Sequence, residues 1–109
     1  MSRFELDTTA FGPVALVTLR GELDMLATAE LEAALERLTD DIVAIDLRDL
    51  LFLDSSGLRT LLLARDRLLG EARRLVLVRG CQAVQRVFEI TRVTDRLEFV
   101  DAPEHVLQR

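Results

Sequence analysis

Short apolar runs, separated by polar or glycine-containing segments, recur along the chain and predict β-strands. Residues 4–8 alternate between apolar and polar side chains, which is the two-residue period of a half-exposed strand. Residues 14–19 are almost continuously apolar, as in a buried strand, and Gly12-Pro13 separates the two segments, so together they predict a hairpin. Two further apolar runs predict buried strands at residues 42–47 and 75–78, and residues 97–100 predict a short last strand.

Two segments next to these strands break the pattern. Gly21 follows the first buried run, and we expect it at a β-bulge or at a positive φ angle, with residues 22–24 forming a short loop. Residues 48–54 are expected to connect the strand at 42–47 to a helix. Asp46 is the odd member of its apolar strand, and because an unpaired buried carboxylate is costly, we expect it to be hydrogen-bonded in support of neighbouring loops.

Between the strands, apolar residues recur at helical spacing. They predict helices at residues 27–38, 56–69 and 82–90, and Pro103 is expected to open a terminal helical turn. Asp24 or Thr28 is expected to cap the first helix, and Gly70 to end the second. The apolar stripe of the second helix, which we expect in the core, consists of Leu58, Leu61, Leu62, Leu68 and Leu69.

The predicted order of elements is ββαβαβαβα. After the hairpin, each gap between strands holds one helix, which is the pattern of parallel strands joined by right-handed crossovers. The sequence therefore predicts an α/β fold with a mostly parallel sheet of four to five strands. Because the 109 residues include no linker-like segment, we expect a single domain over residues 1–109.

The composition limits which kinds of partner and which cellular compartment we expect for this protein. The net charge is −5 and no basic tract is present, which argues against nucleic acid or an anionic membrane and suits a partner with a basic face. Cys81 is the one cysteine, so no intramolecular disulfide can form, as is typical of a reducing compartment. Neither a secretory signal pattern nor an apolar run of about 20 residues occurs, so we expect a cytoplasmic protein without membrane insertion.

The most informative segment is Asp54-Ser55-Ser56-Gly57, where an apolar stretch stops and a helical pattern begins at once. Hydroxyl groups at a helix start can cap the helix, and a phosphate there would meet free backbone N–H groups and the positive end of the helix dipole. The local sequence equally fits an ordinary capped connection between a strand and a helix. The ends of parallel strands are where such folds place functional loops, which favours regulation at this turn.

Catalytic and metal chemistry find little support in the sequence. His105, Cys81 and the scattered carboxylates lack the spacing of metal ligands, and we expect His105 on the surface and Cys81 in a buried or capping position. A small hydrolase with Ser55 as nucleophile stays as an alternative, although it would need a base within hydrogen-bond reach and the only histidine is His105. We therefore expect no enzymatic activity, no metal and no cofactor.

The chain resembles the STAS domain of bacterial anti-sigma factor antagonists over essentially its whole length. The similarity rests on Gly-Glu-Leu-Asp at 21–24, on Ile-Asp-Leu at 45–47 leading into Leu-Asp-Ser-Ser-Gly-Leu at 53–58, and on residues 84–88. This resemblance implies a leading strand followed by βα units. It also implies a module that, when unphosphorylated, binds a kinase-fold anti-sigma factor and so frees the sigma factor. Phosphorylation by that partner ends the binding, and a PP2C-type phosphatase restores it.

Applied to this sequence, the resemblance assigns the phosphorylated position to Ser55, with Ser56 as the second choice and as the expected helix cap. Asp24 is expected at the same end of the sheet. The expected partner surface consists of Asp24, Asp54, Ser56, Gly57, Leu58 and Arg59. Arg59 departs from close relatives, which often carry a small residue at this position. STAS domains also serve as unphosphorylated scaffolds, so a subunit of an ABC-type lipid-transport complex or of another regulatory assembly is the alternative.

Overall fold

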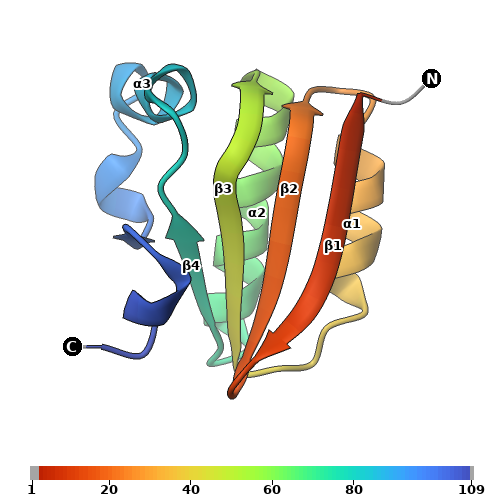
Figure 1. The fold of residues 1–109 in the computed structure, drawn as a ribbon, viewed down its shortest axis with the longest axis vertical. Coiled ribbons are helices and arrows are strands. Elements are labelled where there is room, and N and C mark those ends of the chain that lie inside the picture. Colours follow the sequence, from red (N-terminus) through yellow and green to blue (C-terminus); the bar gives the residue numbers. More distant parts are fainter. Residues whose placement is uncertain (1–2, 109) are drawn as a thin grey trace.

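The computed structural model describes residues 3–108, so the outermost residues of the predicted domain 1–109 lie outside the described residues. Its five-stranded sheet has the order β1-β2-β3-β4-β5, in which β1 is antiparallel to β2 and all other neighbours are parallel. This arrangement confirms the predicted α/β class with a mostly parallel sheet after an N-terminal hairpin (Figure 1). The elements are β1 (Phe4–Phe11), β2 (Val14–Leu23), α1 (Thr28–Glu36), β3 (Ile42–Leu53), α2 (Ser55–Gly70), β4 (Arg74–Val78), α3 (Gln82–Ile90), the 3₁₀ turn η1 (Thr94–Arg96), β5 (Phe99–Val100) and the 3₁₀ turn η2 (Pro103–His105).

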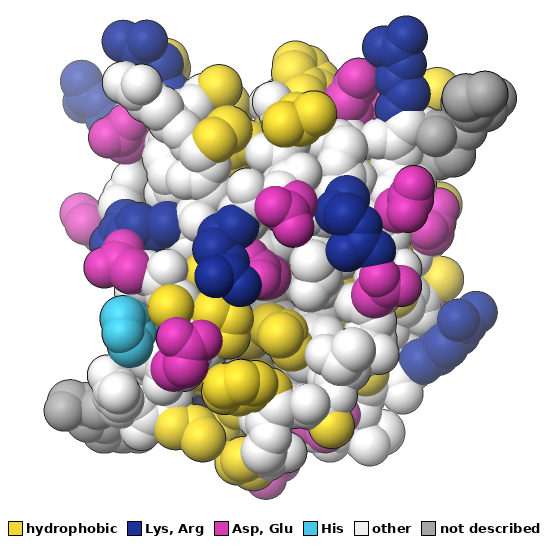
Figure 2. All heavy atoms as spheres, viewed as in Figure 1, with side chains coloured by type: hydrophobic (Ala, Val, Ile, Leu, Met, Phe, Trp, Pro, Cys, Tyr) yellow, Lys and Arg dark blue, Asp and Glu magenta, His cyan; other side chains and the backbone are white. Residues whose placement is uncertain are grey.

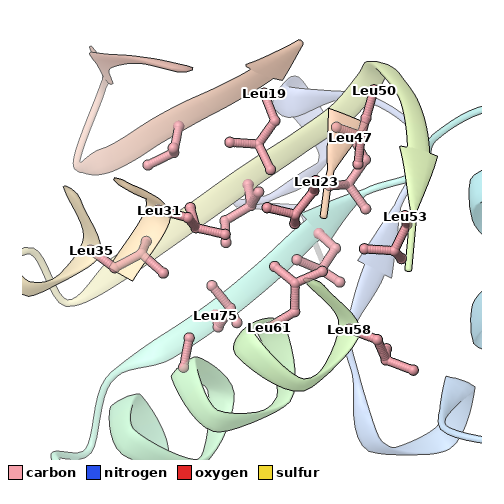
Figure 3. Close-up of a cluster of buried hydrophobic side chains, with 14 of the residues drawn as sticks. Leu19, Leu23, Leu31, Leu35, Leu47, Leu50, Leu53, Leu58, Leu61 and Leu75 are labelled. Atoms are coloured by element: carbon pink, nitrogen blue, oxygen red, sulfur yellow. The ribbon is translucent and has the colours of Figure 1, made fainter. Parts of the chain in front are cut away.

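The helices pack on one face of the sheet, and most of the hydrophobic core lies between the two layers (Figure 1). Leu31 of α1, Leu61 and Leu68 of α2 and Phe88 of α3 belong to one buried cluster with the inward-facing strand residues. Figure 3 shows the leucines of this cluster between the strands and α2. α2 follows the middle strand β3 and packs in this core along its length. This packing fixes the position of the helix on the sheet.

The opposite face of the sheet carries a smaller apolar cluster and a band of charges. That cluster contains Val14, Ala44, Val76 and Val106. Since Val106 follows η2, the C-terminal segment covers part of this face. Arg20 of β2 pairs with Asp7 and approaches Glu5 of β1. Figure 2 shows this face, with charged side chains across its middle and hydrophobic side chains gathered below them.

β3 continues for six residues beyond the predicted end at residue 47, so the prediction that residues 48–54 form a connection is wrong. Two shifts in the pairing of β3 with β2 explain why the apolar pattern did not predict these six residues as strand. In each shift β3 advances one residue more than β2, first between Asp46 and Asp49 and then between Leu50 and Phe52. Such an extra residue is a β-bulge. The inward-facing leucines therefore stand three residues apart rather than two, at Leu47, Leu50 and Leu53.

Asp46 lies at the first bulge and is almost fully buried. Its Oδ1 accepts a hydrogen bond from the backbone N–H of Arg48 at 3.0 Å, and both carboxylate oxygens accept from the Arg48 guanidinium at 2.8 to 3.2 Å. The side-chain hydrogen bond to Asp46 raises the pKa of Arg48 above its ordinary value. Asp46 is thus hydrogen-bonded as expected, but it supports the bulge in its own strand rather than a neighbouring loop.

β2 runs through Gly21 to Leu23, so the predicted loop at residues 22–24 begins two residues too early. Gly21 has a φ of +90°, as expected, and lies opposite Leu50 at the second bulge. A Cβ at Gly21 would lie 1.8 Å from the carbonyl oxygen of Arg3, which accepts a hydrogen bond from the N–H of Glu22. The close approach of residue 3 to this kink leaves no room for a side chain.

Four smaller predictions need correction or confirmation. Leu69 is exposed rather than buried, because it lies on the outer face of α2. Cys81 occupies the N-cap position of α3, but its side chain is exposed and makes no capping hydrogen bond. α2 does end at Gly70, although the positive φ that turns the chain belongs to Ala72. His105 is exposed, as expected.

Gly21→Ala is expected to destabilise the protein far more than Gly12→Ala. Both glycines have positive φ angles, so each alanine carries backbone strain of about 1–2 kcal/mol. Only at Gly21 would the methyl group collide with backbone, whereas nothing lies within 4 Å of a Cβ at Gly12. Urea unfolding should show a loss of about 1 kcal/mol for Gly12→Ala and of at least about 3 kcal/mol for Gly21→Ala. Equal losses would mean that residue 3 moves aside without cost.

Candidate functional site

The ends of β2 and β3 meet beside the first turn of α2 (Figure 1). Leu23, the last residue of β2, pairs with Leu53, the last residue of β3. One residue further on, the backbone N–H of Asp54 donates to the carbonyl of Leu23 at 3.3 Å. This hydrogen bond ties the start of α2 to the neighbouring strand, so Asp24 and Asp54 lie at the same end of the sheet, as expected.

Asp54, rather than a serine, caps α2. Its backbone is extended, and its Oδ1 accepts a hydrogen bond from the N–H of Gly57 at 2.9 Å. A carboxylate at this position satisfies an N–H group that has no partner within the helix, and it lies at the positive end of the helix dipole. The prediction that Ser56 is the cap is therefore wrong. An equally good capping residue stands two positions earlier, which makes Ser55 and Ser56 the first helical residues.

Gly57 and Leu58 are buried beneath this turn. A Cβ on Gly57 would lie 2.5 Å from the carbonyl oxygen of Leu23 and 2.7 Å from a methyl group of Leu53. The absence of a side chain thus allows α2 to approach both strand ends closely. Leu58 belongs to the core. Within the expected partner surface, these two residues position the helix, and the polar residues around them meet solvent.

Ser55 is the exposed serine of the turn, whereas Ser56 is half-buried. The carbonyl of Ser56 accepts a hydrogen bond from Thr60 Oγ1 at 3.1 Å, within the helix. Within residues 3–108, the Ser55 side chain makes no hydrogen bond. Arg59 is also exposed and follows Ser55 by four residues on α2. The accessible polar groups at the start of the helix are therefore one free hydroxyl and one guanidinium.

Asp24 organises the turn between β2 and α1. Its Oδ1 accepts hydrogen bonds from the N–H groups of Leu26 and Ala27 at 3.0 and 3.2 Å. The N-cap position of α1 belongs to Ala27, which makes no side-chain cap, so the prediction that Asp24 or Thr28 caps this helix is wrong. Asp24 is half-buried and lines a pocket of about 270 Å³ together with Glu22, among others.

Four exposed apolar side chains at this end of the sheet were missed by the sequence analysis. We call them the apolar rim: Met25, Leu26, Leu51 and Phe52, with exposed fractions of 70, 88, 71 and 47%. Two follow the end of β2 and two lie in the bulged end of β3, and hydrophobic side chains are visible over these strand ends at the top of Figure 2. Leu51 and Phe52 are large apolar residues inside the segment 48–54, which was predicted to be a connection, and they fit no helical or strand period. This pair was the signal that could have revealed the exposed surface.

The site offers a solvent-accessible hydroxyl at the positive end of a helix dipole, near two carboxylates and one guanidinium. No group of three or more histidine, cysteine or acidic residues that could hold a metal ion occurs within residues 3–108. In the same part of the chain, no helix is both long and apolar enough to cross a membrane.

Asp54→Ala is expected to destabilise the fold by about 1 kcal/mol, because it removes the cap of α2. Asp54→Asn keeps a side-chain oxygen at the same place and should cost only a few tenths of a kcal/mol, since asparagine caps about as well as aspartate. Urea unfolding of the two variants tests this difference. If both variants lose the same stability, the charge of Asp54 matters more than its hydrogen bond to Gly57.

Comparison with known proteins places this geometry in a family. The STAS domain family model matches residues 5–105, whereas the comparison with curated proteins gave no match. An anti-sigma factor antagonist from Mycobacterium paratuberculosis is similar in structure, with a TM-score of 0.87 and 23% identity over 95% of this chain and 91% of that chain. SpoIIAA, an anti-sigma factor antagonist, gives a TM-score of 0.76 in its unphosphorylated form, with 22% identity over 96% of this chain and 95% of that chain. The phosphorylated form of SpoIIAA, a Bacillus cell fate determinant, gives 0.65, with 22% identity over 97% of each chain. These structures share the fold, and because the family model covers nearly the whole described chain, this protein belongs to the STAS domain family.

Proposed function

We propose that this protein is an anti-sigma factor antagonist that is switched by phosphorylation of Ser55. In its unphosphorylated form it binds a kinase-fold anti-sigma factor in the cytoplasm and thereby frees the sigma factor. Phosphate added to Ser55 by that partner ends the binding, and a PP2C-type phosphatase restores it. The antagonist needs no cofactor and has no catalytic role of its own.

The exposure of Ser55 beside an aspartate cap is the observation that carries this proposal. A kinase must reach the acceptor hydroxyl, and Ser55 is exposed while Ser56, the second choice, is half-buried. Because Asp54 supplies the cap, modification of Ser55 removes no hydrogen bond on which α2 depends. Two of the similar structures are of SpoIIAA with and without its phosphate, which supports a phosphate-regulated role for this fold.

The magnitudes favour a switch that acts on binding rather than on folding. A phosphate adds about −1.5 to −2 charge at neutral pH. At a helix start, an anion changes the stability of the fold by only about 0.3–1 kcal/mol. Burying the same charge against a partner costs several kcal/mol unless it is paired, and each 1.4 kcal/mol corresponds to about a tenfold change in affinity. A phosphate on Ser55 would therefore weaken an interface long before it unfolded the domain.

The apolar rim supplies contact area for such an interface. Single exposed apolar residues are common on soluble proteins, but four large ones at the strand ends that flank one regulatory turn are typical of an interaction site. Asp24, Asp54 and Arg59 add charges of both signs among them. The docking surface that we propose thus consists of the apolar rim, these three charged residues and Ser55 itself.

A hydrolase that uses Ser55 is disfavoured by the position of the only histidine. His105 precedes Val106, which packs with Val14 at the start of β2. Ser55 follows the other end of the same parallel strands. The base and the nucleophile would therefore lie at opposite ends of the sheet, which is incompatible with the hydrogen-bond contact that such catalysis needs.

Ser55→Ala should keep binding the anti-sigma factor in the presence of ATP, whereas the unmodified protein should be phosphorylated and released. Ser56→Ala is the matched control and should behave as the unmodified protein. Ser55→Glu should bind more weakly, by at least about tenfold, because it places a negative charge at the same point. Intact-mass analysis after incubation with the kinase, followed by calorimetric titration, measures both steps.

Two outcomes would contradict this scheme. Phosphate found only on Ser56 would move the acceptor by one residue. If a demonstrably active cognate kinase adds no phosphate, and Ser55→Glu binds as tightly as the unmodified protein, the domain is a constitutive scaffold such as a subunit of a lipid-transport complex.

Leu26→Ser and Leu51→Ser should each weaken binding to the anti-sigma factor about tenfold, because burial of one leucine side chain contributes about 1.5–3 kcal/mol. Leu69→Ser is the matched control, since Leu69 is 52% exposed at the opposite end of α2. All three variants should unfold at nearly the same urea concentration as the parent. Unchanged affinity in both rim variants would exclude these side chains from the interface.

A further inference from the structure

We infer that Arg59 is the counter-charge of a phosphate on Ser55, so that the modified α2 holds a phosphate–guanidinium pair within its first turns. This inference rests on the proposed function in one respect, namely that Ser55 is the residue modified. It adds that phosphorylation acts twice at the docking surface. It brings in a negative charge, and it withdraws the guanidinium of Arg59 from any acidic group of the partner.

The spacing of the two residues places them side by side. Ser55 is the first residue of α2 and Arg59 follows four residues later, so their Cβ atoms lie about 5–6 Å apart on one face of the helix. Both side chains are exposed. Long side chains in a helix lean toward its N-terminus, so the guanidinium of Arg59 can reach back over Ser55.

Arg59 is available for such a pair because its side chain has no partner among the described residues of the unmodified protein. α2 contains three arginines, all within the described residues. Arg65 pairs with Asp66, and Arg67 donates to the carbonyl of Leu35. The Arg59 side chain makes no hydrogen bond or ion pair within residues 3–108. A phosphate on Ser55 would therefore not have to compete with an existing carboxylate for this guanidinium.

The charge pattern of the helix lacks an anion where the phosphate would stand. Beyond its cap, α2 has no acidic residue in its first turn, although an anion is favoured at this end of a helix and a cation is not. An anion four residues before a cation is the favourable order for a pair on a helix surface. Phosphate also matches the planar fork of arginine, which can donate two parallel hydrogen bonds.

The test uses protein in which phosphoserine is built in at position 55 during translation, so that no kinase is needed. Phosphorus NMR then follows the second ionisation of the phosphate, whose pKa is about 6. Because the guanidinium favours the dianion, this pKa should be lower by about 0.2–0.4 in the parent than in Arg59→Gln. Arg59→Lys should recover part of the shift, since it keeps the charge without the fork.

Arg37→Gln is the matched control. Arg37 is also exposed, has no ion pair in the part of the chain that the structure describes, and lies at the C-terminal end of α1, away from Ser55. The control should titrate as the parent does. Identical pKa values in the parent and Arg59→Gln would overturn the inference, and so would an equal change in Arg37→Gln, which would show only a general effect of net charge.

The same phosphoserine protein separates this inference from the proposed function. If it binds the anti-sigma factor as tightly as the unmodified protein does, the proposed switch fails, whereas the ³¹P titration still decides whether the pair exists. If it does not bind, while Arg59→Gln leaves the phosphate pKa unchanged, the switch stands and the pair is wrong.

Discussion

The bulged pairing of β2 with β3 is the constraint on which the rest of the site depends. Two extra residues in β3 shift its register against β2, and Gly21 takes a positive φ angle opposite the second shift. A bulge increases the local twist of a strand and redirects the side chains that follow it. As a result, Leu50 and Leu53 still face the core, while Leu51 and Phe52 are turned out to solvent.

The same pairing places the start of α2 beside the end of β2. The carbonyl of Leu23 receives the N–H of Asp54, and Gly57 lies so close to Leu23 that any side chain would collide with it. The helix start is thus held by backbone and core contacts that do not involve Ser55. Asp54 caps the helix and Gly57 permits its approach, whereas the Ser55 side chain makes no hydrogen bond within residues 3–108. The structural residues and the proposed acceptor are neighbours in sequence but differ in their surroundings. The Asp54 carboxylate bonds a helix N–H and Gly57 is buried against the strand ends, whereas Ser55 is exposed.

Much of this architecture could be predicted from the sequence, because apolar periodicity and turn residues are local signals. The alternation of strands and helices gave the sheet class, and the boundaries of α3 were predicted to the residue. The end of β3 was missed because two bulges change its apolar period from two to three, a spacing that no regular strand shows. The cap was misassigned because aspartate and serine cap about equally well, and only the backbone conformation shows that Asp54 stands outside the helix. Exposure of the apolar rim depends on which layer covers each strand end, which is a property of the assembled core.

The separation between the structural residues and Ser55, the proposed acceptor, also determines how a phosphate at this site could act. The Ser55 side chain makes no hydrogen bond within residues 3–108, so a phosphate there cannot act by breaking a contact of the core. It can act through charge, and at an exposed helix start the effect of charge on folding is limited to about 1 kcal/mol by solvent and counter-ions. At an interface, water is excluded, so the same charge must be paired with an opposite charge or it opposes binding. The effect of a phosphate would therefore depend on a partner. It would change the stability of the isolated domain only slightly, but it would strongly weaken a complex. A phosphate on Ser55 could therefore be added and removed without refolding of the domain, as the proposed switch requires.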